Sequence, residues 1–174
     1  SGIRTILSRE SEMARIDPLT GVANRRFFYE WAELVMEQAR RYGRPLTVVY
    51  LDLDNFKNIN DLWGHQEGDK MLMAVAATIK DTIRKTDIVA RLGGDEFVIL
   101  LPEADQEQAR AVVDKLQNRV FALYRKSGQP VSFSMGVVTF HAIPDTVDQL
   151  VTAADQLMYK VKATGKSNVI YSEK

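Results

Sequence analysis

The sequence contains no cysteine, which excludes disulfide bonds and thiolate metal sites. It has only two histidines, His65 and His141, so a histidine-rich metal site is not expected. Lysine plus arginine equals aspartate plus glutamate at 23 each, so no overall basic charge favours nucleic acid or a membrane surface as a partner. No apolar run approaches the length of a membrane span. Any anionic ligand would have to be met by local positive charge.

The 174 residues are enough for one domain with a sizeable core and too few for two ordinary domains. Apolar residues recur at helical spacing over residues 3–16, and this helix would begin without a cap, so we expect it to continue from an upstream segment. The opening Ser-Gly (residues 1–2) is typical of a cloning scar. We therefore expect the chain to be a fragment.

The remaining apolar patterns predict helices that alternate with mostly buried strands. Helical spacing covers residues 23–41, 70–84, 105–126 and 146–163, and short apolar runs predict strands over 45–53, 87–92, 97–102, 131–140 and 168–172. This order predicts a mixed α/β or α+β sheet of about five strands with helices packed on it. The first of these helices is expected to bury Phe27, Phe28, Trp31, Leu34 and Val35.

Acidic residues lie at the ends of predicted strands. Asp52 ends the most hydrophobic strand, and Asp95 and Glu96 lie on a hairpin whose glycines, Gly93 and Gly94, tolerate the positive φ of tight turns. Carboxylates that converge at one sheet edge repel each other unless a divalent cation neutralises them, and Mg²⁺ prefers such oxygen ligands. In the alternative interpretation, Asp52 only begins a turn and the hairpin acids face water.

Four sequence blocks together resemble the GGDEF family, the diguanylate cyclases. They are "DPLTGVANRR" (17–26), "DLDNFKNINDLWGHQEGD" (52–69), "RLGGDEF" (91–97) and, more loosely, "LMYKVKATGKSN" (157–168). The resemblance runs from about residue 15 to residue 170. It implies an α+β fold with a central, mainly antiparallel sheet of about five strands flanked by helices, palm-like as in nucleotidyl cyclases. It divides the chain into the remnant of a signalling helix (1–16) and a catalytic domain (17–174).

The resemblance implies that two GTP molecules are condensed into cyclic di-GMP, with release of two pyrophosphates, across a homodimer of half-sites. The metal would be Mg²⁺, with Mn²⁺ as the alternative ion, held by Asp52, the carbonyl of Leu53, Asp95 and Glu96. Asp95 is the family's usual candidate for general base, and Lys57 would offset charge on the phosphates in the transition state. Glu96 would support a second metal ion.

The same resemblance assigns the GTP contacts. Asn60 and Asp69 would recognise guanine, because an amide donates to its acceptor edge and a carboxylate accepts from its N–H groups. Further GTP contacts implied by the motifs are Phe56, His65, Gly93, Gly94, Lys162 and Lys166. Lys166 stands where the family more often has arginine, and lysine lacks the bidentate fork that grips phosphate. Gly64 and Gly68 are expected to serve backbone turns near the base.

The R-x-x-D pattern of Arg84 and Asp87, followed by Arg91, resembles the family's inhibitory product site. It implies feedback inhibition by cyclic di-GMP, although a helix-end ion pair would explain the pattern alone. The competing hypothesis for the whole chain is a non-catalytic GGDEF domain that acts as a receptor for GTP or cyclic di-GMP. An upstream sensor or regulatory domain would be missing from the fragment. The domain is expected to be cytoplasmic without contacting a membrane, even if a longer parent protein is anchored in one.

Overall fold

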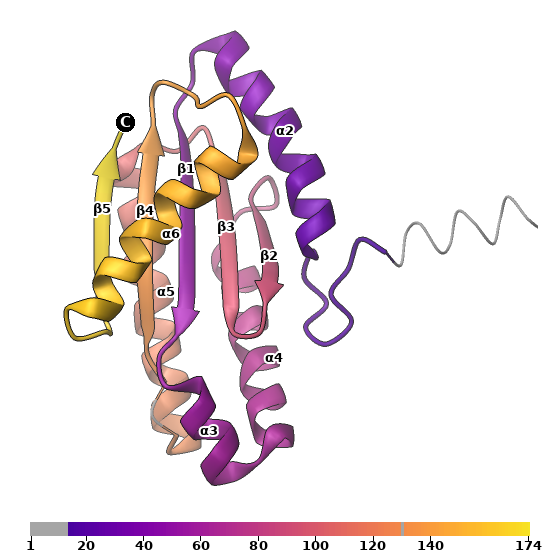
Figure 1. Ribbon diagram of the computed structural model, residues 1–174, viewed down its shortest axis with the longest axis vertical. Helices are drawn as coiled ribbons and strands as arrows, with labels where there is room; N and C mark the ends of the chain where they lie inside the picture. Colours follow the sequence, from indigo (N-terminus) through magenta and orange to yellow (C-terminus); the bar gives the residue numbers. More distant parts are fainter. Residues whose placement is uncertain (1–13, 130) are drawn as a thin grey trace, which may run out of the picture.

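The computed structural model describes residues 14–129 and 131–174, and its centre is a five-stranded sheet (Figure 1). The strands are β1 (Leu46–Leu53), β2 (Ile88–Gly93), β3 (Glu96–Pro102), β4 (Phe133–Phe140) and β5 (Val169–Glu173). Their spatial order is β2-β3-β1-β4-β5, and only the pair of β4 and β5 is parallel. The predicted α+β fold with a mainly antiparallel sheet is therefore confirmed.

Two layers of helices cover the sheet. Helices α2 (Arg25–Tyr42) and α6 (Val147–Ala163) pack on one face, and α4 (His65–Thr82) and α5 (Gln106–Ser127) pack on the other (Figure 1). The short helix α3 (Phe56–Trp63) follows β1 directly and lies beyond the end of the sheet. The polar block from residue 54 to 69 thus forms α3 and the first turn of α4, where the apolar pattern alone predicted no separate helix.

Strand β1 is central and is buried on both faces, which explains its continuous apolar sequence. Successive side chains of a strand point to opposite faces. Val48 and Tyr50 therefore pack with α2 and α6, whereas Val49 and Leu51 pack with α4 and α5. The same alternation directs Asp52, two residues after Tyr50, toward the face that α6 covers.

The hairpin between β2 and β3 differs in one detail from its prediction. Gly93 pairs with Glu96, so the two central turn residues are Gly94 and Asp95 instead of the two glycines. Only Gly94 has a positive φ, 42°, at the position where a type II′ turn takes its glycine. The turn therefore presents Asp95 at its tip, beside the end of β1.

The N-terminal region departs from the sequence interpretation in two ways. Trp31 and Leu34 were expected in the core, but they are 39% and 55% exposed, because α2 buries Phe28, Ala32, Met36 and Ala39 instead. These four residues recur at helical spacing and form one face of α2, and Trp31 and Leu34 lie beside that face. Residues 14–16, the end of the predicted signalling helix, form a turn and an isolated bridge, and residues 1–13 lie outside the described residues.

Helix α6 approaches the sheet most closely at Gly136 of β4. A Cβ atom there would lie 2.1 Å from the carbonyl oxygen of Ala154 and 2.6 Å from the backbone nitrogen of Met158. The neighbouring atoms are helix backbone, which cannot rotate away. Gly136 therefore sets the distance between β4 and the helix that carries Lys162.

Across residues 14–129 and 131–174, none of the helices is both long enough and apolar enough to cross a membrane.

We predict that Gly136→Ala lowers the free energy of unfolding by about 1–3 kcal/mol, the usual cost of overpacking a core. Chemical denaturation measures this directly. The matched control is Gly93→Ala, also in a strand, where a Cβ atom would meet nothing within 4 Å. It should stay within about 0.5 kcal/mol of the wild type. Equal effects at the two glycines would contradict the proposed close approach of α6.

Candidate functional site

The acidic residues at the end of β1 and on the β2–β3 turn lie side by side. Asp52 pairs with Glu96 across the two strands, and the N–H of Leu53 donates to the carbonyl of Asp95 at 3.3 Å. The Asp95 carboxyl is also close enough to Asp52 to raise the pKa of that side chain. The structure thus brings together all four residues predicted to hold the metal.

Asp52 is in an unusual electrostatic position. Its side chain is only 13% exposed, and Oδ2 lies 3.1 Å from the ammonium of Lys162 on α6. Oδ1 is buried and has no hydrogen-bond partner. Burial, and then the neighbouring Asp95 carboxyl, raise the pKa of Asp52 to about 7, although Lys162 acts in the opposite direction. A buried carboxylate oxygen without a partner is costly, and a cation would remove that cost.

These groups fit a hard divalent cation that takes part of its shell from a substrate. Within the described residues there is no group of three or more His, Cys, Asp or Glu placed to hold a metal ion by side chains alone. Mg²⁺ commonly uses only one or two carboxylates, with waters and substrate phosphates completing the octahedron. The pair of Asp52 and Asp95, with one buried Asp52 oxygen that has no hydrogen-bond partner, is compatible with that kind of site.

Glu96 is engaged on the same face of the sheet. Its Oε2 accepts a hydrogen bond from the hydroxyl of Tyr50 at 2.7 Å. Burial and then this bond raise the pKa of Tyr50, so the phenol remains a donor. Asp155 of α6 lies nearby, and its pKa is raised by burial and by the Glu96 charge. Asp52, Asp95 and Glu96 together form an acidic edge of the sheet, which we call the acidic rim. Glu96 extends the negative charge of this rim toward α6.

Two lysines, Lys162 at the end of α6 and Lys166 in the loop that follows it, bring positive charge to this rim. Lys162 contacts Asp52, and it also lies 3.5 Å from Oδ1 of Asp54. The ammonium of Lys166 donates to Oδ1 of Asn55, in the turn between β1 and α3, at 2.8 Å. Both predicted phosphate contacts therefore meet the end of β1 at the acidic rim.

The predicted guanine contacts lie on the paired helices α3 and α4. Gly68 is a buried residue inside α4, not a turn residue as the sequence suggested, and a Cβ atom there would lie 1.8 Å from Oδ1 of Asn60. Gly68 thus makes room for the amide of Asn60 directly beside Asp69. Gly64, with φ of 88°, does form the turn between the two helices.

Three more predicted contacts surround these helices. Lys57 is exposed near the start of α3, one residue after the half-buried Phe56. His65 is exposed at the first position of α4. Asn60 is half-buried on α3 and Asp69 is exposed on α4, whereas Gly93 and Gly94 are exposed at the hairpin turn.

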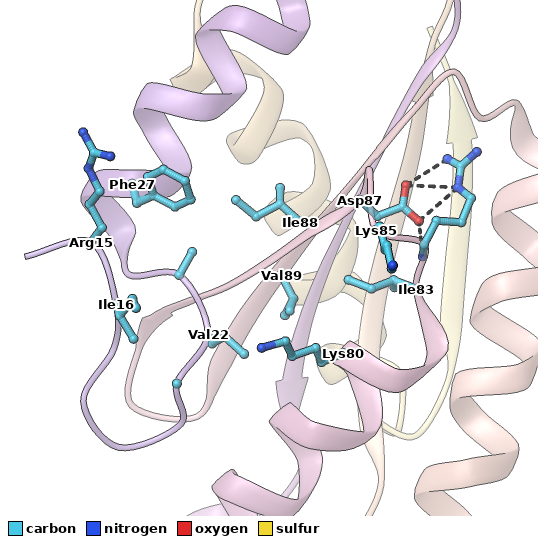
Figure 2. Close-up of a pocket in the computed structure, with 13 residues that line it drawn as sticks. Arg15, Ile16, Val22, Phe27, Lys80, Ile83, Lys85, Asp87, Ile88 and Val89 are labelled. Carbon is cyan, nitrogen blue, oxygen red and sulfur yellow. Dashed lines mark hydrogen bonds and ion pairs between the residues drawn. The ribbon is translucent and has the colours of Figure 1, made fainter. Parts of the chain in front are cut away.

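The predicted product-site residues divide into two places. The guanidinium of Arg84 forms a forked pair with Asp87, whose side chain is fully buried, beside a pocket of about 580 Å³ lined also by Lys80 and Lys85 (Figure 2). Arg91 instead lies 3.3 Å from Asp17 and donates through Nε to the carbonyl of Gly94. Arg91 therefore joins the N-terminal turn to the hairpin, at the other end of β2.

The sequence reasoning missed Asp54 and Tyr50 as parts of this region. Asp54 is 2% exposed and is fully hydrogen-bonded, and Tyr50 holds Glu96. The alternation of a strand places Tyr50 and Asp52 on one face, which the sequence contains as a signal, and Lys162 contacts both Asp52 and Asp54.

Comparison with known proteins gives a consistent result. The family model described as "Diguanylate cyclase, GGDEF domain" matches residues 14–168. Uncharacterized protein YhcK of Bacillus subtilis is 37% identical over 166 residues, which are 92% of this chain and 46% of that protein. Diguanylate cyclase DosC of Escherichia coli is 37% identical over 158 residues, which are 88% of this chain and 34% of that protein. The chain therefore spans less than half the length of these curated relatives.

Solved structures share the fold over nearly the whole chain. Diguanylate cyclase SiaD of Pseudomonas aeruginosa, in complex with its activator SiaC, has a TM-score of 0.86 at 32% identity, covering 97% of this chain and 66% of that one. The coiled coil and GGDEF domain of DgcB from Caulobacter crescentus, in complex with c-di-GMP, has a TM-score of 0.88 at 26% identity, covering 97% of this chain and 91% of that one.

We predict that Asp52→Asn stabilises the metal-free protein at pH 8 by about 1–3 kcal/mol, because it removes a buried charge. The pKa of Asp52 is raised from 3.8 to about 7, so the penalty is complete above pH 7 and disappears below pH 4, where both states are protonated. The gain should therefore shrink as the pH falls through this window. Denaturation of both proteins between pH 4 and pH 8 measures it.

The control for this prediction is Asp61→Asn on exposed α3, which should change stability little at any pH. Added Mg²⁺ should stabilise the wild type at pH 8 and leave Asp52→Asn unaffected. A variant that is less stable than the wild type at pH 8 would show that the ion pair with Lys162 outweighs the burial of Asp52.

Proposed function

The chain belongs to the GGDEF family, and we propose from this that it is a diguanylate cyclase, which condenses two GTP molecules into cyclic di-GMP and releases two pyrophosphates. The observation that carries the proposal is Asp52, which keeps one buried oxygen without a hydrogen-bond partner while Asp95 and Lys162 lie close to its carboxyl group. Family members that have lost catalytic activity are expected to lack some of the signature acids or lysines. Here the acids and the lysines are all present at one rim.

In this proposal GTP lies along the rim from α4 to α6. Asn60 and Asp69 recognise guanine, since the amide donates to its acceptor edge and the carboxylate accepts from its N–H groups. The triphosphate extends toward Lys162 and Lys166, which approach from the α6 side. Phe56 and His65 border the base, and the open space at Gly93 and Gly94 lets the nucleotide approach the hairpin backbone.

Asp52, Asp95 and the Leu53 carbonyl would hold Mg²⁺, or Mn²⁺, with Glu96 in support. When bound, the ion orients the phosphates and neutralises charge in the displacement. The ribose 3′-oxygen of one GTP forms a bond to the α-phosphorus of the other. The bond from that phosphorus to the bridging oxygen breaks, and pyrophosphate leaves. In this proposal Asp95 accepts the hydroxyl proton, and Lys57 offsets phosphate charge.

The reaction needs two GTP molecules that face each other, and one rim of this chain accommodates one. We therefore propose that two copies form a homodimer in which each contributes a half-site. A sensor or regulatory domain in a longer parent protein would control how the half-sites meet, as the partial coverage of the relatives allows. We place the domain in the cytoplasm, where GTP is available.

We also propose that cyclic di-GMP inhibits the enzyme at Arg84 and Asp87. Their forked pair lies beside a mainly apolar pocket that Lys80 and Lys85 also line, and the DgcB structure that shares this fold was obtained with c-di-GMP. An arginine fork suits both guanine and phosphate. Arg91 is a weaker candidate for this site, because its contacts are to Asp17 and Gly94.

The second candidate function is a receptor that binds GTP or cyclic di-GMP without turnover. The ion pair between Lys162 and Asp52 favours this receptor function, because a lysine that stays bound to Asp52 would keep a metal ion from binding that carboxylate.

We predict that the protein, at high concentration with GTP and Mg²⁺, forms cyclic di-GMP that chromatography detects. Asp95→Asn should lower turnover by at least about a hundredfold, because one metal-binding carboxylate charge is lost. The control is Asp61→Asn, an exposed acid on α3 that should keep wild-type turnover. Tight GTP binding without product, in a protein confirmed to be dimeric, would instead support the receptor function.

We further predict that Gly68→Ala weakens GTP binding about tenfold without lowering the free energy of unfolding, because alanine favours the helix but displaces the Asn60 amide. Calorimetric titration and denaturation measure the two effects. The matched control, Ala77→Ser on the exposed face of α4, should change neither. Unchanged GTP affinity in Gly68→Ala would remove Asn60 from the guanine site.

A further inference from the structure

Asp54 is a buried carboxylate that no step of the proposed reaction uses. Its side chain is 1% exposed. Oδ1 accepts from the hydroxyl of Ser134 at 2.5 Å and lies 3.5 Å from the Lys162 ammonium. Oδ2 accepts from the hydroxyl of Ser132 at 2.7 Å and from the N–H of Ser167 at 2.9 Å. A buried charge is tolerated only when it is satisfied in this way.

These donors come from two different parts of the chain. Ser132 lies directly before β4 and Ser134 lies near its start, and the carbonyl of Ser132 also accepts from the backbone N–H of Asp54. Lys162 and Ser167 belong to the end of α6 and the loop that follows it. If Asp54 only joined β1 to β4, the contacts with Ser132 and Ser134 would be sufficient. The contacts with Lys162 and Ser167 tie Asp54 to the segment that carries the cations.

The loop after α6 has a strained backbone. Lys166 and Ser167 both have positive φ, 65° and 50°, a conformation that costs free energy for residues with a side chain. The N–H of Ser167 donates to Asp54, and the N–H of Lys166 donates to the carbonyl of Val161. Asp54 thus compensates the strain at the position next to Lys166.

Asp54 also shares Lys162 with Asp52. The ammonium is 3.1 Å from Asp52 and 3.5 Å from Asp54, so it lies between the two carboxylates. When a metal ion occupies Asp52, the ammonium loses much of its attraction to that group. The charge of Asp54, which faces Lys162 and has no access to water, then remains to hold the lysine at the rim.

We propose that Asp54 is a positioning residue, which sets Lys162 and Lys166 for the terminal phosphates of the nucleotide by anchoring both ends of their segment. This inference rests on the proposed function, since it assumes that these lysines meet a triphosphate. Asp54 itself touches no substrate. Its removal should therefore affect the recognition of the β- and γ-phosphates and leave the recognition of guanine unchanged.

The test is Asp54→Asn, which has the same shape. An amide in this place cannot accept from both Ser167 and Lys162, whichever way it is turned, and it carries no charge. We expect the affinity for a non-hydrolysable GTP analogue with Mg²⁺ to fall about tenfold, as for the loss of a charge-assisted hydrogen bond, while the affinity for GMP stays within about twofold. Calorimetric titration of both nucleotides gives the ratio.

The matched control is Ser132→Ala, which removes a donor from the same carboxylate on the β4 side only. Both variants should lose stability, but only Asp54→Asn should change the ratio of the two affinities. A proportional loss for GMP and the GTP analogue, or the same change of ratio in Ser132→Ala, would show that Asp54 is only structural. If the wild type itself binds the two nucleotides equally, the proposed triphosphate site fails, and the positioning role with it.

A second variant tests whether Asp54 affects nucleotide binding through Lys162 and Lys166 or independently of them. In a Lys162→Met, Lys166→Met background, Asp54→Asn should weaken the GTP analogue by less than about twofold, because its effect depends on those cations. The full tenfold loss in that background would contradict the proposal.

Discussion

Negative charge is concentrated where β1 leaves the sheet, and much of the surrounding structure compensates for it. Asp52 and Asp54 follow a strand that is buried on both faces, and the hairpin turn adds Asp95 beside them. Lys162 neutralises part of this charge, Ser132 and Ser134 satisfy another part, and Oδ1 of Asp52 remains without a partner. Such a site is costly to fold and is therefore ready to accept a cation.

The fold meets this cost by rigid placement of the compensating groups. Gly136 lets α6 lie directly against β4, which brings Lys162 to the end of β1. The central position of β1 fixes Asp52, and the two-residue turn at Gly94 fixes Asp95. Each of these positions depends on backbone geometry more than on side-chain packing. The acidic rim is therefore a property of the sheet and of its closest helix together.

The sequence predicted the sheet, its hairpin and the main helices, because their apolar periods are strong over eight or more residues in α2, α4, α5 and α6. It failed for Trp31 and Leu34, because the buried face of α2 is centred on Phe28, Ala32, Met36 and Ala39 and leaves these two side chains beside it. It also treated Gly68 as a turn residue. The space that Gly68 leaves for Asn60 depends on how α3 packs on α4, and no local pattern encodes that contact.

For the site, the motifs predicted which acids and lysines would lie close together. The structure brings the residues predicted to bind the metal, and both lysines, to the acidic rim. The motifs assigned Arg84 and Arg91 to one product site, because the two residues are close in sequence. In the structure they lie toward opposite ends of β2. The motifs also did not indicate Asp54 as an anchor. Its donors are some 80 residues or more away along the chain, so only the assembled sheet reveals them.

The most direct test of this account is a crystal structure of the protein with a non-hydrolysable GTP analogue and Mg²⁺. The account predicts a metal ion bound to Oδ1 of Asp52 and to Asp95, with Lys162 displaced from Asp52, still beside Asp54 and directed at the terminal phosphates. A nucleotide bound elsewhere, or one bound at the rim with no metal ion and with the ion pair of Lys162 and Asp52 intact, would contradict it.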